Sequence, residues 1–450
     1  MKKDRFSRSN RDRSAELVNV AQVKERLKRR LRSGLQTNYG GLFLMIPYLQ
    51  NQMLEQKIAA LALEEKGIGV LESFLYQVFL EMLGKSAGFS TKDLGPAVAS
   101  GLPAHPSKSY RHRFLNRPDL LATDRFIRAI GKRQVETGQV KGCVLACDTT
   151  LAVYSGKKDI LKDMPSQEKL PQKAIRFYVV VDEGLRNPVY LKAAYPGKRP
   201  FEVGKDMVDA TTEILGGRES TFIFDKWFSV GELLEYINQR DQKYITLLKR
   251  HANRIREMEE IPLEQFHRLT EYERITHIPV CLRNYTEEAR LVVIELTVEE
   301  ERFLFGYLTN DYDRLDEEIA RLYPTRWDSE FWIEEMSFMN LKHLPSTDLS
   351  KISFNLAAKL VAYNTMSAFR GNLGEEYIAH NVKTIHDLFF KEQALVRLNN
   401  REELEVTIFG HEHAAVLESM YSGLSEKLLE QGISPGVSWL NDYPLKLVFR

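Results

Sequence analysis

Two aspartates and a later glutamate are the residues of this chain best suited to chemistry. Asp148 lies in the apolar run GCVLACDTT, and Asp225 closes a second apolar run, STFIFD. An ionised carboxylate in such a setting is costly unless it is paired or binds a metal ion. Because ligand groups gather at strand ends in α/β sheets, the aspartates and a helical glutamate predict an all-oxygen site for Mg²⁺ or Mn²⁺. Two such ions, about 3.5–4 Å apart, would suit phosphodiester displacement by water or a 3′-hydroxyl.

Each aspartate also has a purely structural explanation. Asp148 could cap a bulge through Thr149 or Thr150, and Asp225 could start the turn into the next helix. Taken singly, each aspartate fits either explanation equally well. Their joint placement on the first and fourth strands of the predicted order favours a site.

The elements around the aspartates predict an α/β fold with a mixed sheet. Three strand-like runs in hairpin succession begin at the Asp148 run, and a helix at about 200–215 leads to the strand that ends at Asp225. A second helix at 229–240 and the strand KYITLLKR follow. This is the strand and helix order of a ribonuclease H-like fold, in which helices flank the sheet. Residues 256–310 then predict three or four further strands, which form a β-rich insertion.

Five segments are predicted along the chain. They are a helical, basic, DNA-binding region at 1–140, the first part of the catalytic core at 141–255, the β-rich insertion at 256–315, the second part of the core with the glutamate helix at 316–375, and a helical C-terminal region at 376–450. Between Met1 and Gly34 there are 12 Lys or Arg and 4 Asp or Glu, a balance of +8, whereas the whole chain has a net charge of +1. Such a segment can neutralise DNA phosphates, and a solvated basic tail explains it equally well.

The composition excludes several classes of protein. With 43% hydrophobic and 28% charged residues, the chain is expected to be globular. It contains no apolar run near the ~20 residues that a membrane span needs and no secretory signal at its start. Three cysteines fit a reducing compartment better than a disulfide scaffold.

Three motifs resemble the catalytic blocks of bacterial insertion-sequence transposases of the DDE type. They are ACDTT, then FDKWFS with the YITLLKR strand, then Tyr323-x2-Arg326-x3-Glu330. The resemblance covers about 141–370 and is strongest to the group that has a β-stranded insertion and the signature Tyr-x2-Arg-x3-Glu-x6-Lys. It implies cut-and-paste transposition, in which the enzyme cuts at transposon ends and joins the 3′-ends to target DNA.

The resemblance also implies the cofactors, partners and location of the protein. Asp148, Asp225 and Glu330 would be the catalytic residues and would hold two Mg²⁺ or Mn²⁺ ions. The partners would be double-stranded DNA, as transposon ends and target, and a second copy of the chain in the DNA complex, with no membrane. The location would be the bacterial or archaeal cytoplasm, at the nucleoid when DNA is bound.

The third acid has two candidates. The lysine that the signature places seven positions after the glutamate is Ser337 when counted from Glu330, whereas Lys342 lies seven positions after Glu335. The residues of the signature that precede the glutamate favour Glu330. We therefore predict Glu330, with Glu335 as the alternative.

Basic and aromatic residues around the carboxylates are the candidate DNA contacts. Tyr323 and Arg326 would contact phosphates by analogy with the family, and the guanidinium fork of arginine matches phosphate oxygens. The full predicted set is Tyr323, Arg326, Lys342, Lys226, Lys249 and Arg250. The aromatic cluster of Trp327, Phe331 and Trp332 is expected to pack in the core.

Two other functions fit the same residues. A nuclease with this site would hydrolyse DNA without joining it. A transposase-derived DNA-binding protein with a decayed site is the second alternative, because the lysine after Glu330 is missing.

Overall fold

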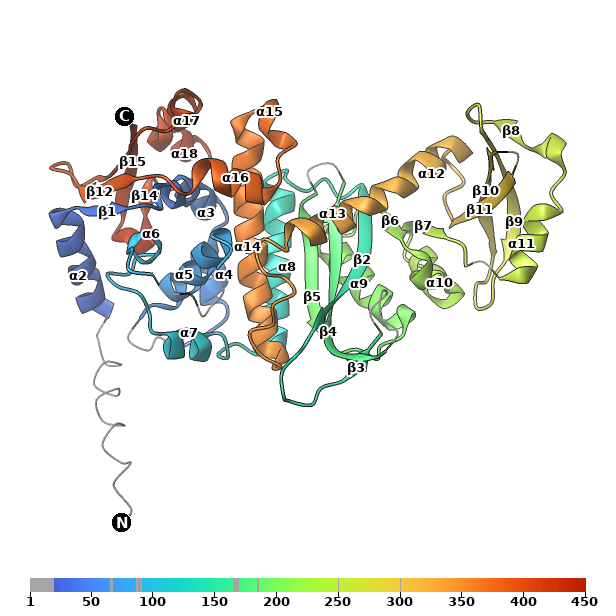
Figure 1. Cartoon of the computed structure of the whole chain (residues 1–450), viewed down its shortest axis with the longest axis horizontal. Coiled ribbons are helices and arrows are strands. Elements are labelled where there is room, and N and C mark those ends of the chain that lie inside the picture. The colour runs from blue at the N-terminus through green and yellow to red at the C-terminus, as the bar shows by residue number, and fades with distance from the viewer. Residues whose placement is uncertain are drawn as a thin grey trace, which may run out of the picture. The chain divides into compact units, whose positions relative to one another are not determined.

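The computed structural model describes residues 20–64, 68–85, 89, 91–164, 170–183, 186–249, 251–299 and 301–450 (Figure 1). They form two compact units. Unit 1 comprises Met1–Ile130 and Glu335–Arg450, and unit 2 comprises Gly131–Glu334. The first unit thus joins the two ends of the sequence, and the second contains the predicted aspartates.

Unit 2 is built on one large mixed sheet. Its strands are β2 (Val144–Val153), β3 (Lys162–Asp163), β4 (Gln172–Asp182), β5 (Pro188–Ala194), β6 (Thr221–Phe224), β7 (Lys243–Leu247), β8 (His267–Arg268), β9 (Glu273–Cys281), β10 (Glu288–Val298) and β11 (Glu301–Thr309). Their hydrogen-bonded order is β3-β4-β2-β6-β7-β11-β10-β9-β8, and β5 pairs with β4.

The centre of this sheet confirms the predicted ribonuclease H-like fold. Strand β2 is antiparallel to β4, and β4 is antiparallel to β5, whereas β6 is parallel to both β2 and β7. Three hairpin-connected strands followed by two parallel ones are the predicted order. In the β2–β6 ladder, Cys147 pairs with Phe224, so the next residues, Asp148 and Asp225, emerge side by side.

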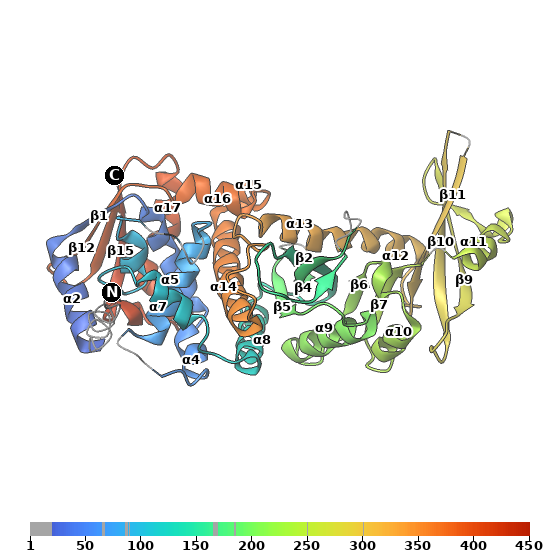
Figure 2. The same cartoon turned by 60° about the horizontal axis from the view of Figure 1, so that its bottom comes forward.

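Helices cover both faces of the sheet, which explains why its central strands are apolar throughout. The helices of unit 2 are α9 (Pro200–Ile214), α10 (Gly231–Asn238), α11 (Ala252–Glu259), α12 (Asp316–Leu322) and α13 (Trp327–Glu335), with short 3₁₀ turns η2 (Lys226–Phe228), η3 (Leu263–Gln265) and η4 (Tyr323–Arg326). Figure 2 shows α9 and α10 on one face of the sheet and α12 and α13 on the other.

The β-rich insertion is confirmed, and it is continuous with the central sheet. Strand β11 pairs antiparallel with β7, with Thr309 opposite Ile245. One buried cluster includes Ile223 of the central sheet and Val292 of the insertion, and Tyr323 of η4 packs against it. The insertion therefore shares a core with the strands that hold the aspartates.

Unit 1 combines helices from both ends of the sequence. They are α2 (Val20–Ser33), α3 (Ile46–Asn51), α4 (Leu54–Ala59), α5 (Val70–Met82), α6 (Gly95–Ala99), α7 (Lys108–Phe114), α8 (Leu120–Glu136, whose last turn belongs to unit 2), α14 (Leu349–Leu373), α15 (Glu375–Ile378), α16 (Val382–Phe389), α17 (Ala414–Tyr421) and α18 (Leu424–Glu430), with 3₁₀ turns η1 (Gly40–Met45) and η5 (Ser438–Leu440). Asp348 caps the N-terminus of the long helix α14, because its carboxylate accepts hydrogen bonds from the Ser350 and Lys351 amides. Most of its residues are buried.

Unit 1 also contains a five-stranded sheet that the sequence analysis did not predict. The strands are β1 (Leu35–Thr37), β12 (Ala394–Leu398), β13 (Leu404–Ile408), β14 (Gly436–Val437) and β15 (Tyr443–Phe449), in the order β1-β12-β13-β15-β14. Leu35 pairs with Val396, which joins segments more than 350 residues apart. The terminal regions are thus helical, as predicted, but they also share a sheet.

No helix among the residues described is long and apolar enough to cross a membrane.

Candidate active site

Asp148 is largely buried and faces a guanidinium. Its Oδ1 accepts a hydrogen bond from the Thr149 amide at 2.7 Å, and its Oδ2 lies 3.7 Å from Arg326 Nη1. Burial, together with the negative charges of Asp225 and Glu330, raises the pKa of Asp148 to about 7, against the opposing effects of the Thr149 amide and Arg326. Burial is the largest of these causes, and two other carboxylates lie near enough to add to it.

Asp225 ends β6 and begins the 3₁₀ turn η2. Its Oδ1 accepts a hydrogen bond from the Trp227 amide at 2.8 Å, and its main-chain oxygen accepts one from Thr246 Oγ1 at 3.0 Å. The turn-forming role considered for Asp225 is therefore correct. It uses one carboxylate oxygen and leaves Oδ2 for another partner.

Arg326 joins the glutamate helix to Asp148. Its Nη1 lies 2.6 Å from Glu330 Oε1, an i,i+4 pair across the start of α13. The turn η4, which carries Arg326, packs against both β2 and β6. Of the two candidate glutamates, Glu330 is thus the one whose charge acts on Asp148.

Glu335, the last residue of α13, already belongs to unit 1, and its partners lie in the same unit. Tyr363 Oη donates a hydrogen bond to Glu335 Oε2 at 2.6 Å, and Arg370 Nη1 lies 3.3 Å from Oε1. The side chains of Glu335 and Arg370 are 10% and 7% exposed, so this is a buried ion pair. Glu335 lies five positions after Glu330 on the helix, which turns their side chains about 140° apart.

Tyr323 and Lys249 lie next to the carboxylates. Tyr323 stacks on Tyr307, with ring centroids 4.4 Å apart. Burial raises the pKa of Tyr323 to about 12, and nearby Arg326 acts in the opposite direction. Burial also lowers the pKa of Lys249, whereas the charge of Asp225 raises it.

The structure gives only the exposure or the place in the chain of the other predicted DNA contacts, Lys226, Lys342 and Arg250. Lys226 is exposed on η2, directly after Asp225. Lys342 is exposed in unit 1. Arg250 lies outside the described residues.

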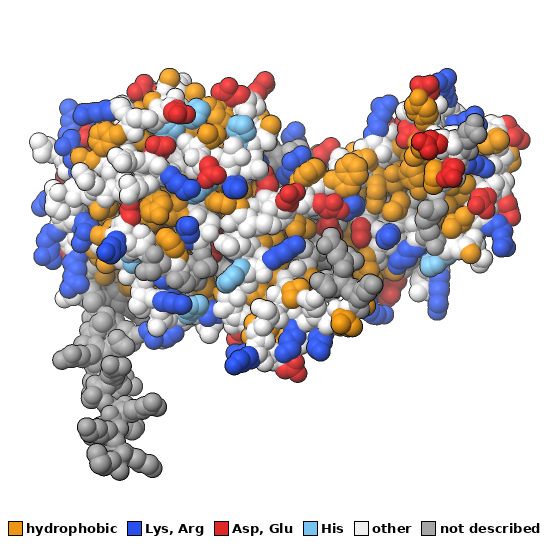
Figure 3. Space-filling model, in the orientation of Figure 1, with side chains coloured by type: hydrophobic (Ala, Val, Ile, Leu, Met, Phe, Trp, Pro, Cys, Tyr) orange, Lys and Arg blue, Asp and Glu red, His pale blue; other side chains and the backbone are white. Residues whose placement is uncertain are grey.

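The aromatic cluster on α13 is only partly in the core. Trp332 is buried, as predicted, but Trp327 and Phe331 are 54% and 46% exposed, so the core prediction is wrong for them. The short helix can bury only one of its faces, and Trp332 occupies that face. Figure 3 shows hydrophobic side chains at the surface along α12 and α13.

Arg176 was missed by the sequence analysis. From β4 it donates to Thr149 Oγ1 at 3.3 Å and to Asp163 Oδ2, and its guanidinium lies 4.9 Å from the centre of the Trp227 ring. It therefore connects the residues that follow Asp148 and Asp225. An arginine within the apolar run AIRFYVVVD was the signal that could have revealed it.

Comparison with known proteins now adds to this geometry. Residues 175–365 match the family model described as the transposase DDE domain. The matched residues therefore resemble a transposase DDE domain. The match includes Asp225, Glu330 and Glu335 and begins after Asp148.

A solved structure of piggyBac transposase, in a synaptic complex with hairpin DNA, is similar with a TM-score of 0.45 and 11% identity, over 77% of this chain and 78% of that chain. No curated protein sequence matches the chain.

The chemistry of the carboxylates of Asp148, Asp225 and Glu330 fits a divalent cation. Hard ions such as Mg²⁺ and Mn²⁺ take carboxylate oxygens, and the backbone amides that bind Asp148 and Asp225 use only one oxygen of each. Within the described residues no three His, Cys, Asp or Glu side chains are grouped as metal ligands. Glu330 is paired with Arg326 through Oε1, which leaves its Oε2 as the oxygen that could bind a cation.

The raised pKa of Asp148 predicts that this residue destabilises the metal-free domain at high pH. A carboxyl group whose pKa is near 3.8 in the unfolded chain and about 7 in the folded protein is ionised more readily in the unfolded chain. The free energy of unfolding therefore falls as the pH rises through that interval. In EDTA, Asp148→Asn should therefore raise the free energy of unfolding at pH 8 by roughly 3 kcal/mol, and much less at pH 4. Thermal or urea unfolding at the two pH values measures the difference.

Asp206 provides a control of opposite sign. Burial would raise the pKa of Asp206, but hydrogen bonds from Lys198 at 2.7 Å and Lys192 at 3.0 Å bring it below its usual value. Asp206→Asn should therefore lower stability at pH 8. Equal destabilisation by both variants at pH 8 would contradict the explanation given for Asp148.

Proposed function

We propose that this protein is a cut-and-paste DNA transposase. It would cleave DNA at transposon ends and join the 3′-ends to target DNA, as a homodimer on double-stranded DNA in the bacterial or archaeal cytoplasm. The observation that carries the proposal is the register of two parallel strands, which brings Asp148 and Asp225 together opposite the Arg326–Glu330 pair. The match of 175–365 to the transposase DDE domain supports it.

Asp148, Asp225 and Glu330 are the proposed catalytic residues and metal ligands. Two Mg²⁺ or Mn²⁺ ions bound there would supply an activated water or 3′-hydroxyl and would stabilise the leaving oxygen. The protein's part is to fix the ligands, which strand β2, the η2 turn and helix α13 do separately. Because burial and neighbouring carboxylates make the charge of Asp148 costly, a cation is favoured at this point.

Arg326 is proposed to bind a DNA phosphate when the carboxylates hold metal ions. Its buried Nε has no hydrogen-bond partner among the described residues, and its Nη1 is shared between Glu330 and Asp148. A phosphate oxygen would accept a hydrogen bond from the unpaired Nε–H, because the guanidinium fork donates to two oxygens side by side. Tyr323, one turn earlier, would lie beside the same phosphate.

The remaining proposed DNA contacts are basic side chains. Lys226 follows Asp225 in the sequence, and Lys249 lies near enough to Asp225 to be affected by its charge. Lys342 is exposed after the glutamate helix. Arg250 is proposed from the sequence alone. Such residues position the DNA backbone without reading its sequence.

A strand-transfer assay tests the proposal directly. The full chain is incubated with Mg²⁺ or Mn²⁺, a target plasmid and a linear DNA substrate. The ends of this substrate carry the sequences that flank the gene encoding the protein. When the substrate is uncut, the expected result is cleavage at its 3′-ends. When the substrate is already cleaved, the expected result is its joining to the target plasmid. Cleavage without any joined product from pre-cleaved ends would identify a nuclease instead.

A decayed DNA-binding protein is the second candidate. It is favoured by Ser337 at the signature's lysine position and by the bonding of Glu330 to Arg326. Calorimetric titration with Mn²⁺ separates the two functions, because a working site should bind the ion and lose affinity in Asp225→Ala. Absence of binding by the wild type would favour the decayed protein.

A further inference from the structure

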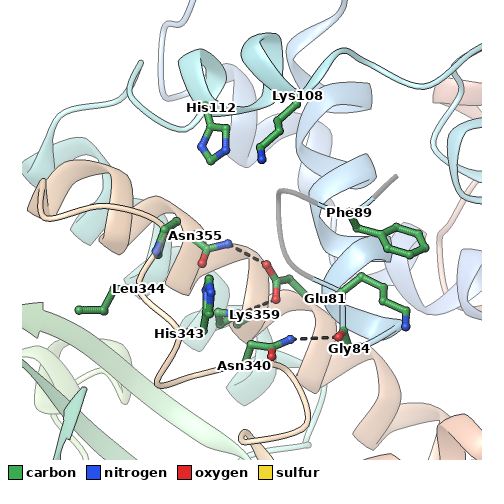
Figure 4. Close-up of a pocket in the computed structure, with 12 residues that line it drawn as sticks. Glu81, Gly84, Phe89, Lys108, His112, Asn340, His343, Leu344, Asn355 and Lys359 are labelled. Carbon is green, nitrogen blue, oxygen red and sulfur yellow. Dashed lines mark hydrogen bonds and ion pairs between the residues drawn. The ribbon is translucent and has the colours of Figure 1, made fainter. Parts of the chain in front are cut away.

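A cavity of about 670 Å³ lies in unit 1 and has no part in the proposed chemistry. Its walls come from α5, α7, α14 and the segment after α13 (Figure 4). Pockets of 300–1,000 Å³ are typical of small-molecule and cofactor sites. The cavity is therefore large enough for a single nucleotide.

A buried and fully paired carboxylate lies at one side of the cavity. Glu81, which is 1% exposed, is bonded to Lys359 Nζ at 2.5 Å, Asn355 Nδ2 at 2.7 Å and Gln77 Nε2 at 2.5 Å. Lys359 Nζ also donates to the Met339 main-chain oxygen. The negative charge of Glu81 is thus neutralised, and its oxygens are occupied.

The other charged side chains that line the cavity are basic. Lys108 and His112 are four residues apart on α7, so they share one face of that helix, and Figure 4 shows them together on the side opposite Asn355. Lys85 and His343 line the cavity from other segments. Lys85 Nζ lies over the Phe89 ring, 5.3 Å from its centroid. In the described part of the chain, Lys108 forms no ion pair with a carboxylate. Burial lowers the pKa of His112, and the positive charges of Lys351, Lys108 and Arg111 lower it further.

We propose that this cavity binds a phosphate group of a nucleotide, held by Lys108 and His343 with His112 as a hydrogen-bond donor. A phosphate offers several strong acceptor oxygens and more negative charge than a carboxylate, which suits an amine and imidazoles that line one cavity. The phosphate could belong to a DNA strand or to a free mononucleotide, and both have the same chemistry. The proposal goes beyond the transposase function and does not depend on its carboxylates.

Fluorescence anisotropy with a labelled, 5′-phosphorylated dinucleotide tests the proposal on the full chain at low salt. Saturable binding is expected, and the double substitution Lys108→Gln with His343→Gln should weaken it by about tenfold or more. Lys108→Arg keeps the charge and should keep the affinity, while Lys383→Gln, on the exposed part of α16, is the matched surface control. Thermal unfolding verifies that each variant is folded.

Competition identifies the source of the phosphate. Competition by deoxyadenosine monophosphate at similar concentration assigns the cavity to free nucleotides, and competition only by longer strands assigns it to DNA. The proposal is overturned by absence of saturable binding, by equal binding of unphosphorylated deoxyadenosine, or by unchanged affinity of the folded double variant. Asp225→Asn should bind the dinucleotide normally while losing strand cleavage, so failure here and failure of the proposed function are distinguishable.

Discussion

Asparagine in place of Asp148 or Asp225 is expected to lower the rate of metal-dependent strand cleavage by about 10³-fold or more. Asparagine keeps the side-chain oxygen that accepts from the Thr149 or Trp227 amide, so the strand ends and the η2 turn should stay intact. It removes the charge that an ion requires. Gel analysis of end cleavage by the purified full-length variants measures the loss.

The double variant should be little worse than either single one, because residues that act as one unit do not contribute additively. Asp206→Asn is the matched control, since Asp206 is partly buried and paired with two lysines on the same unit. It should retain near wild-type cleavage under conditions where it is folded. Cleavage at the wild-type rate by Asp148→Asn or Asp225→Asn would refute the proposed site.

Local pattern was enough to predict the centre of unit 2. Each aspartate follows a short apolar run bounded by polar residues, and a parallel sheet buried on both faces requires such runs. Once Asp148 and Asp225 are assigned to neighbouring strands, the register that pairs Cys147 with Phe224 brings them together. The prediction therefore depended on periodicity and strand order, which the sequence contains.

Long-range pairing was not predictable in the same way. Leu35 and Val396 form a sheet across most of the sequence, and nothing in the short LQT run distinguishes a strand from a loop. The role of Arg176 also depends on neighbours from three segments, because it contacts Thr149, Asp163 and Trp227. Such contacts follow from the folded arrangement and have no local signature.

The two candidate glutamates should respond differently to the same substitution. Glu330→Gln is expected to lower cleavage by about 10²-fold or more and to change the free energy of unfolding by less than about 0.5 kcal/mol. The reason is that Glu330 is half-exposed and pairs only across one helical turn with Arg326. Cleavage rates and urea unfolding of the same preparations measure both quantities.

Glu335→Gln should give the reverse pattern. It removes the negative charge from the buried pair with Arg370 and weakens the acceptor for Tyr363, so a loss of about 2–3 kcal/mol in unfolding free energy is expected. Cleavage should persist at temperatures where the variant is folded. A folded Glu335→Gln variant without cleavage, together with an active Glu330→Gln variant, would transfer the role of third acid to Glu335. The contrast is informative because both residues lie on α13 but face different partners: Glu330 an arginine that also faces Asp148, and Glu335 an arginine of the unit 1 core.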